Sequence, residues 1–66
     1  MILFAIRDKK SGNFWRDRKD EGIELLPFDH CSVFTEQCVA EELALKHGNK
    51  DAELIEITLT TRAIPW

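Results

Sequence analysis

The feature that most constrains this chain is that only one segment has the apolar spacing of a helix. Residues 36–47 repeat an apolar or small side chain at every third or fourth position, which places one apolar stripe on a polar helix. Thr35 is suited to cap its start through the hydroxyl group, and Gly48 with Asn49 is suited to end it in a left-handed conformation. A chain of 66 residues has room for a single small domain, residues 1–66, so this helix must share one core with the strands.

Other segments show the alternation of apolar and polar side chains that is typical of strands. Residues 2–16 predict a β-hairpin, residues 31–35 a third strand and residues 52–61 a fourth. The segment 23–29 contains Pro27, which cannot donate a hydrogen bond in a central strand, so we expect it to be irregular. This order predicts an α+β domain with a three- to four-stranded, mainly antiparallel sheet and one helix on one face.

A sheet has two faces, and one helix covers only one of them. The side chains that we expect under the helix are Ile2, Phe4, Ile6, Ile55, Ile57 and Leu59. The other face then carries Leu3, Ala5 and Leu54. Two explanations for its cover remain open: the segment 23–28 folds over it, or a second protein does, either another copy or a target.

Charge is unevenly distributed along the chain. Residues 7–19 contain six basic and two acidic side chains, whereas residues 20–57 contain ten acidic and two basic ones. The net charge of −3 argues against a surface that binds nucleic acid throughout. Three interpretations of the basic hairpin remain open: a solvated hairpin whose charge opposes aggregation, a protein-docking surface, or a phosphate contact with Trp15 stacked on an unpaired base.

The sequence has no enzyme or metal motif that we recognise. Cys38 and His47 lie nine positions apart, which on a helix places them on opposite faces. His30 and Cys31 are neighbours whose side chains point apart in a strand, so they do not form a nucleophile–base pair. We therefore expect no catalytic residue, no metal and no cofactor.

Cellular location is indicated by cysteine content and hydropathy. Two cysteines are too few for a disulfide scaffold. No segment approaches the ~20 apolar residues that a membrane span needs. We expect a cytoplasmic protein that does not enter a membrane.

Three segments resemble small uncharacterised accessory proteins of bacteriophages and prophages. They are AIRDKKSGNF (5–14), VFTEQCVAEELA (33–44) and AELIEITL (52–59). The resemblance covers most of the chain and concerns the pattern of strands, turn and helix. It implies a bacterial host cell, a role by binding that includes modulation of a host protein, and no catalytic residues.

These observations predict a non-enzymatic phage or prophage accessory protein that binds a protein partner, either a host protein or a second copy in a homodimer. The alternative is a weak single-stranded nucleic-acid binder that uses the basic hairpin 7–19. The residues expected to contact the partner are Lys9, Lys10, Trp15, Arg16, Arg18, Leu3 and Trp66.

Overall fold

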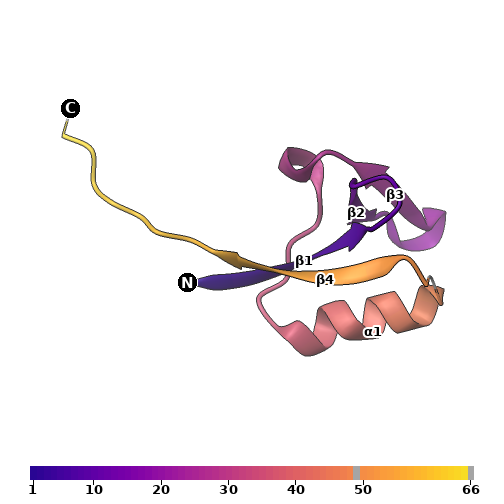
Figure 1. The fold of residues 1–66 in the computed structure, drawn as a ribbon. Coiled ribbons are helices and arrows are strands. Elements are labelled where there is room, and N and C mark those ends of the chain that lie inside the picture. Colours follow the sequence, from indigo (N-terminus) through magenta and orange to yellow (C-terminus); the bar gives the residue numbers. More distant parts are fainter. Residues whose placement is uncertain (49, 66) are drawn as a thin grey trace.

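The structure is a computed structural model that describes residues 1–48 and 50–65. Its elements are strands β1 (Ile2–Asp8), β2 (Phe14–Asp17), β3 (Ile23–Leu26) and β4 (Ala52–Thr58), helix α1 (Gln37–His47), and the 3-10 turns η1 (Lys19–Glu21) and η2 (Phe28–His30). The strands form one antiparallel sheet in the order β3-β2-β1-β4, with α1 beside it (Figure 1). The predicted α+β class is confirmed.

The hairpin predicted for residues 2–16 forms, and Asp8 organises its turn. The Asp8 carboxylate accepts hydrogen bonds from the N–H and the hydroxyl of Ser11, at 2.9 and 2.7 Å. These bonds hold the pKa of Asp8 below its usual value, because they stabilise the charged carboxylate. Gly12 adopts a φ of 76°, which a side chain would disfavour, and donates its N–H to the Asp8 carbonyl at 2.8 Å. The turn is thus fixed by local hydrogen bonds.

The strand predicted for residues 31–35 does not form. The segment makes one isolated bridge, in which Phe34 and Phe4 exchange two backbone hydrogen bonds of 2.8 Å. Just before it, the N–H of Ser32 donates to the carbonyl of Trp15 at 3.1 Å, and the Ser32 hydroxyl accepts from the end of β2 at 2.9 Å. The segment therefore lies between β1 and β2 where these two strands no longer pair with each other, and it has too few paired residues to be a strand.

The remaining strand comes from the segment 23–29, which we expected to be irregular. Here β3 pairs with β2 along its whole length, with Leu25 opposite Trp15. Pro27 does not interfere, because it follows the last paired residue and β3 lies at an edge of the sheet. The expectation of an irregular conformation is correct only after Leu26, where the chain turns through η2.

Helix α1 forms where predicted, one residue shorter at its start. It begins at Gln37, and its N-cap residue is Glu36 rather than Thr35. It ends at Gly48, whose φ of 58° is left-handed and whose N–H donates to two carbonyls of the last turn. The predicted contribution of Asn49 lies outside the described residues.

Strand β4 is shorter than the predicted strand 52–61, because its partner β1 begins at Ile2. The ladder ends with the N–H of Leu59, which donates to the carbonyl of Met1 at 2.9 Å. Residues 60–65, the C-terminal arm, continue as an exposed segment that extends away from the body of the molecule (Figure 1).

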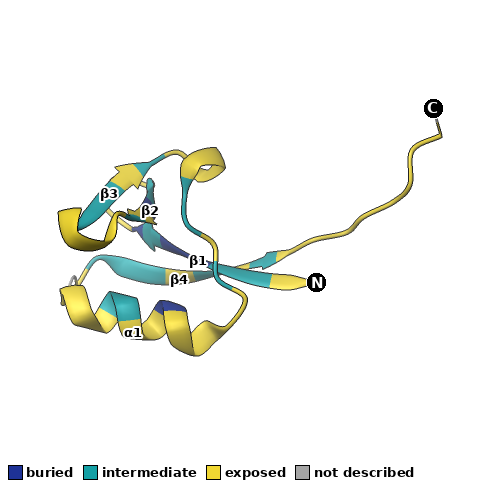
Figure 2. Cartoon of the chain, turned by 180° about the vertical axis from the view of Figure 1, so that it is seen from behind, coloured by how far each residue is buried: buried dark blue, intermediate teal, exposed yellow. Residues whose placement is uncertain are grey.

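The core lies between the sheet and α1. Ile6, Trp15 and Ala40 are buried at its centre, and Figure 2 shows the helix on one side of the strands. The edge of the Trp15 ring meets the ring of His47, with centroids 5.9 Å apart, which ties the end of the helix to β2. Packed around this centre are Phe4, Ile23, Phe34, Leu43, Ala44 and Ala52.

Candidate protein-binding surface

The pairing of β1 with β4 decides which residues the helix covers. Ile6 packs in the core and lies directly opposite Leu54, and opposite residues share a face of the sheet. Ile55 and Ile57 alternate with Leu54 and point to the uncovered side, with Leu59 in step with them. The prediction that these three pack under the helix is therefore wrong, and so is the placing of Leu54 on the other face. The alternation of side chains along a strand shows which residues share a face, but it does not show which face the helix packs against.

The uncovered side, termed the open sheet face, carries a row of apolar side chains. Val33 belongs to it because the bridge between Phe4 and Phe34 places Val33 opposite Ala5. Val33 is 50% exposed, and the larger aliphatic side chains of the two strands are half-buried. Contiguous apolar side chains on an uncovered face are a feature of interaction sites. The members of this row are Leu3, Ala5, Val33, Ile55 and Ile57.

The segment 23–28 covers only one end of the open sheet face. Its Phe28 ring packs edge-on against the Phe14 ring, with centroids 5.1 Å apart, so η2 lies at the β2 end. Ile23 instead packs against the buried core on the helix side. Of the two explanations that the sequence left open, self-coverage therefore accounts for part of this face and leaves the β1–β4 part uncovered.

An ion pair stands beside the apolar row. Arg7 lies opposite Glu53, and its Nε donates to the Glu53 carboxylate at 2.6 Å. The same guanidinium lies over the Phe14 ring, 5.9 Å from the centroid. The pair joins β1 to β4 and separates the aliphatic part of the open sheet face from its aromatic end.

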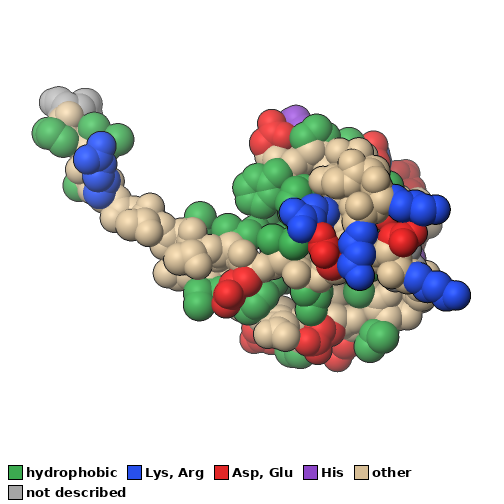
Figure 3. Space-filling view, in the orientation of Figure 1, with side chains coloured by type: hydrophobic (Ala, Val, Ile, Leu, Met, Phe, Trp, Pro, Cys, Tyr) green, Lys and Arg blue, Asp and Glu red, His purple; other side chains and the backbone are tan. Residues whose placement is uncertain are grey.

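The predicted partner-binding lysines lie in the β1–β2 turn. Lys9 and Lys10 are exposed there, and Arg16 is exposed on β2, on the same side of the sheet as Phe14. Figure 3 shows basic side chains at this end of the body with acidic ones between them. The basic hairpin is thus a mixed-charge surface with a positive excess.

Arg18 is engaged within the chain. Its guanidinium forms ion pairs with Glu21 at 3.1 Å and with Glu24 at 2.7 Å. Both partners follow β2 in the sequence, so these pairs brace the β2–β3 connection. Arg18 therefore contributes less to a docking surface than the sequence predicted.

Of the two tryptophans expected to contact a partner, the structure describes only Trp15. Trp15 is 2% exposed, so the folded chain does not offer it as an anchor for a protein or as a platform for a base. Its Nε1 has no hydrogen-bond partner within the described residues. Its neighbour Phe14 is the aromatic residue on the open sheet face. Trp66, expected near Leu3, lies outside the described residues.

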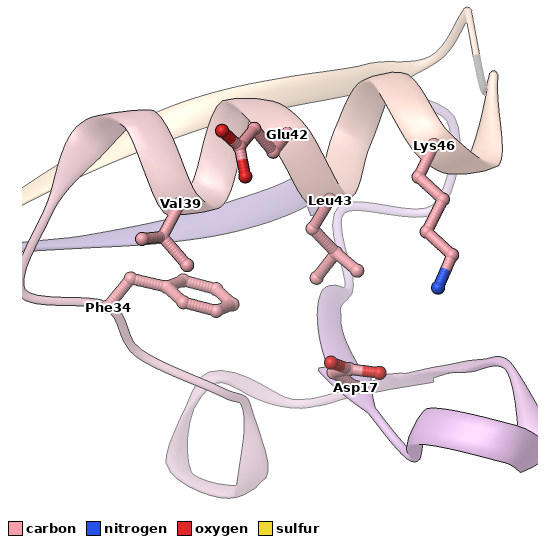
Figure 4. Close-up of a pocket in the computed structure, with 6 residues that line it drawn as sticks. All are labelled: Asp17, Phe34, Val39, Glu42, Leu43 and Lys46. Carbon is pink, nitrogen blue, oxygen red and sulfur yellow. The ribbon is translucent and has the colours of Figure 1, made fainter.

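A shallow hollow of about 230 Å³ lies beside α1 on the covered side. Figure 4 shows its wall, to which Val39 and Leu43 of the helix and Phe34 of the incoming loop contribute apolar side chains. Ligand sites for small molecules usually measure roughly 300–1,000 Å³ and are more enclosed. The hollow therefore does not favour a small-molecule substrate. Its remaining lining residues are Asp17, Glu42 and Lys46.

The two cysteines have different surroundings, and neither belongs to a group of metal ligands in the described residues. Burial raises the pKa of the Cys31 thiol, which disfavours the thiolate. The exposed Cys38 thiol donates to the carboxylate of Glu36, with sulfur and oxygen 3.7 Å apart. In residues 1–48 and 50–65, no three or more His, Cys, Asp or Glu side chains are grouped so that they would hold a metal ion.

Comparison with models of protein families, with curated proteins and with solved structures found no match to this chain. The part of the chain that the structure describes contains no helix with the length and apolar character of a membrane span. The open sheet face is therefore the feature from which a function is best argued.

Proposed function

We propose that the chain is a non-enzymatic accessory protein of a bacteriophage or prophage, and that it binds a protein partner in the cytoplasm of the bacterial cell. The observation that carries this proposal is the apolar row of the open sheet face, where Leu3, Ile55 and Ile57 remain half-exposed. Burial of apolar surface gains about 25 cal/mol per Å², so a partner on this face would gain free energy from each of these side chains.

The surroundings of the row favour a protein with an apolar centre and an acidic rim. Arg16 and the turn residues Lys9 and Lys10 are exposed at the β2 end of the molecule. Protein interfaces commonly combine an apolar centre with a charged rim that steers association. The buried position of Trp15 removes the residue on which the nucleic-acid alternative was expected to stack a base.

A role by binding, without catalysis, is supported by the state of the reactive side chains. The raised pKa of Cys31 keeps its thiol protonated at neutral pH, and a protonated thiol is a poor nucleophile. The phage setting is supported by the resemblance of the segments 5–14, 33–44 and 52–59 to phage accessory proteins.

The test is an affinity pull-down from bacterial lysate with wild-type protein and two variants. Leu3→Lys places a charge on the open sheet face, and Val39→Lys places one on the exposed flank of α1 as a matched control. We expect a protein to be retained by the wild type and by Val39→Lys, and to be lost with Leu3→Lys.

Nuclease treatment of the lysate should leave this capture unchanged. Capture that disappears with nuclease would indicate nucleic-acid binding instead. Equal capture by Leu3→Lys and the wild type would contradict the role of the open sheet face. A wild-type chain that captures no protein and remains monomeric would contradict the proposal as a whole.

A further inference from the structure

We infer that one partner of this chain is a second copy, which pairs antiparallel along the outer edge of β4 about a two-fold axis at Ile55. A single sheet then runs through both copies. The inference deepens the proposed function and rests on it only in that both treat the chain as a protein-binding module.

Within residues 1–48 and 50–65, no strand pairs with the backbone groups on the outer edge of β4, since β4 ends the sheet order. Two hydrogen bonds at the ends of the β1–β4 ladder show which residues of β4 bond to β1. The Leu59 N–H donates to the Met1 carbonyl at 2.9 Å, and the Lys9 N–H donates to the Asp51 carbonyl at 2.8 Å. Odd-numbered residues of β4 therefore bond to β1, and even-numbered ones turn their N–H and C=O outward. The outward residues are Ala52, Leu54, Glu56 and Thr58.

The two edges of the sheet are not equivalent. β4 offers seven residues without proline, glycine or lysine, and its two charged side chains, Glu53 and Glu56, are the residues that would oppose pairing at this edge. β3 offers four residues and is followed directly by Pro27. An added strand therefore finds a longer and more regular template at β4.

One register pairs all seven residues of β4 with those of a second copy and sets no glutamate against a glutamate. About an axis at Ile55, every glutamate faces an aliphatic side chain. The opposite pairs are Leu54 with Glu56, Glu53 with Ile57, and Ala52 with Thr58 of the second copy. An axis at Glu56 would set that residue against its own copy, and like charges directly opposite are destabilising. The Ile55 register uses all seven residues of β4 and avoids this repulsion.

The two flanks of α1 differ in what they contact. One flank of α1 faces the loop residue Phe34, as Val39 and Leu43 show in Figure 4. The opposite flank, toward the β4 edge, carries Leu45, which is 80% exposed. A large aliphatic side chain beside a free edge gains an apolar neighbour when a second sheet is added.

In the dimer with this register, the C-terminal arm of one copy lies beside the start of β4 in the other copy. Antiparallel pairing about Ile55 sends residues 60–65 of one copy past Ala52 of the other. A shallow hollow lies there, lined by Ala44, Leu45, Gly48, Lys50 and Ala52. In a single chain the arm is exposed throughout (Figure 3).

The open sheet faces of the two copies also become continuous. Ile55 and its symmetry mate form a non-hydrogen-bonded pair on that face, in which Cα atoms are about 4.5 Å apart. The apolar row then extends across the axis and presents a surface twice as wide to any further partner.

The register is tested by disulfide cross-linking in a background of Cys31→Ser and Cys38→Ser. Ile55→Cys should give a disulfide-linked dimer of twice 7.7 kDa under mild oxidation, because about 4.5 Å between Cα atoms suits a disulfide. Ile57→Cys is the matched control: it shares the face and the burial class, and in this register its symmetry mate is four residues out of step, more than 7 Å away. Linkage at Ile57 equal to that at Ile55, or at neither position, would overturn the inference.

A second measurement uses proline at each edge. Leu54→Pro removes an outward N–H from β4, and Leu25→Pro removes one from β3. Light scattering should show the wild type and Leu25→Pro as dimers and Leu54→Pro as a folded monomer, with folding checked by circular dichroism. A dimer that persists in Leu54→Pro would contradict edge pairing. Leu3→Lys leaves the edge intact, so lysate capture that depends on Leu3 can fail or succeed separately from dimerisation.

Discussion

The two faces of the sheet are made from the same strands and have different parts in the molecule. On the covered face, Ile6 and Trp15 are buried under α1. On the open sheet face, Leu3, Ile55 and Ile57 stay half-exposed. The contrast teaches that helix α1, with 11 residues, completes one core and leaves apolar side chains of the second face partly in contact with water.

The largest expected effect is at the centre of the covered face. Trp15→Ala should cost about 3–5 kcal/mol of unfolding free energy, which equals the roughly 3–5 kcal/mol that a core of this size supplies. We expect circular dichroism to show a largely unfolded chain at 25 °C. Trp15→Phe, which removes an Nε1 that lacks a partner in the described chain, should stay folded. A cooperatively folded Trp15→Ala protein would contradict the central place of this ring.

A matched pair of isoleucines compares the faces directly. Ile6→Ala should cost about 2–5 kcal/mol, because it opens a cavity in the core. Ile57→Ala should cost about 1 kcal/mol, because its side chain is already partly in water. Urea unfolding measures both. Equal losses would mean that the open sheet face is packed as tightly as the covered one.

Acidification tests the turn at the end of the covered face. The folded-state pKa of Asp8 lies below its usual value of 3.8, so its contribution to stability is present above that value and is lost as the pH falls through the lowered pKa. Asp8→Asn should lower the melting temperature at neutral pH by a few degrees. The variant should also lose less stability than the wild type between neutral and acidic pH. Parallel curves for the two proteins would show that Asp8 has no such role.

The smallest effect is expected for the ion pair on the open sheet face. Arg7 and Glu53 are both partly exposed, so Glu53→Gln should cost about 0.2–1 kcal/mol. Salt should weaken the wild type more than this variant, because only the wild type has the charge pair. Thermal melts at low and high salt measure the difference. A loss of several kcal/mol would show that this pair supports the fold as strongly as the core does.

The sequence predicted the elements that depend on local signals. The turn residues between Asp8 and Asn13 and the glycine at position 48 act through their own backbone conformations, so hairpin and helix end could be read from the chain. The segment 23–29 could not, because the effect of Pro27 depends on where the strand ends and on its place at an edge of the sheet, and neither is set locally. Residues 31–35 have strand composition, but pairing needs a neighbour, and only Phe34 finds one in β1.

The sequence predicted that one face of the sheet would be uncovered, but it predicted only some of the residues on that face. One helix covers only one face of a sheet, so a second face follows from geometry alone, and the structure has such a face around Leu3. Which residues of β4 share it depends on the register with β1, and nothing local sets that register. Phe14 and Trp15 are adjacent, and either of them in the core would satisfy the alternation, so the burial of Trp15 appears only when α1 is placed.

The most direct test follows methyl resonances by NMR as the captured partner is added, or as the concentration of the chain itself is raised. We expect the methyl signals of Leu3, Ile55 and Ile57 to shift with binding while those of Ile6 and Leu43 stay in place. Shifts confined to Ile6 and Leu43, or none at any concentration or with any captured protein, would contradict the account of an open face kept for association.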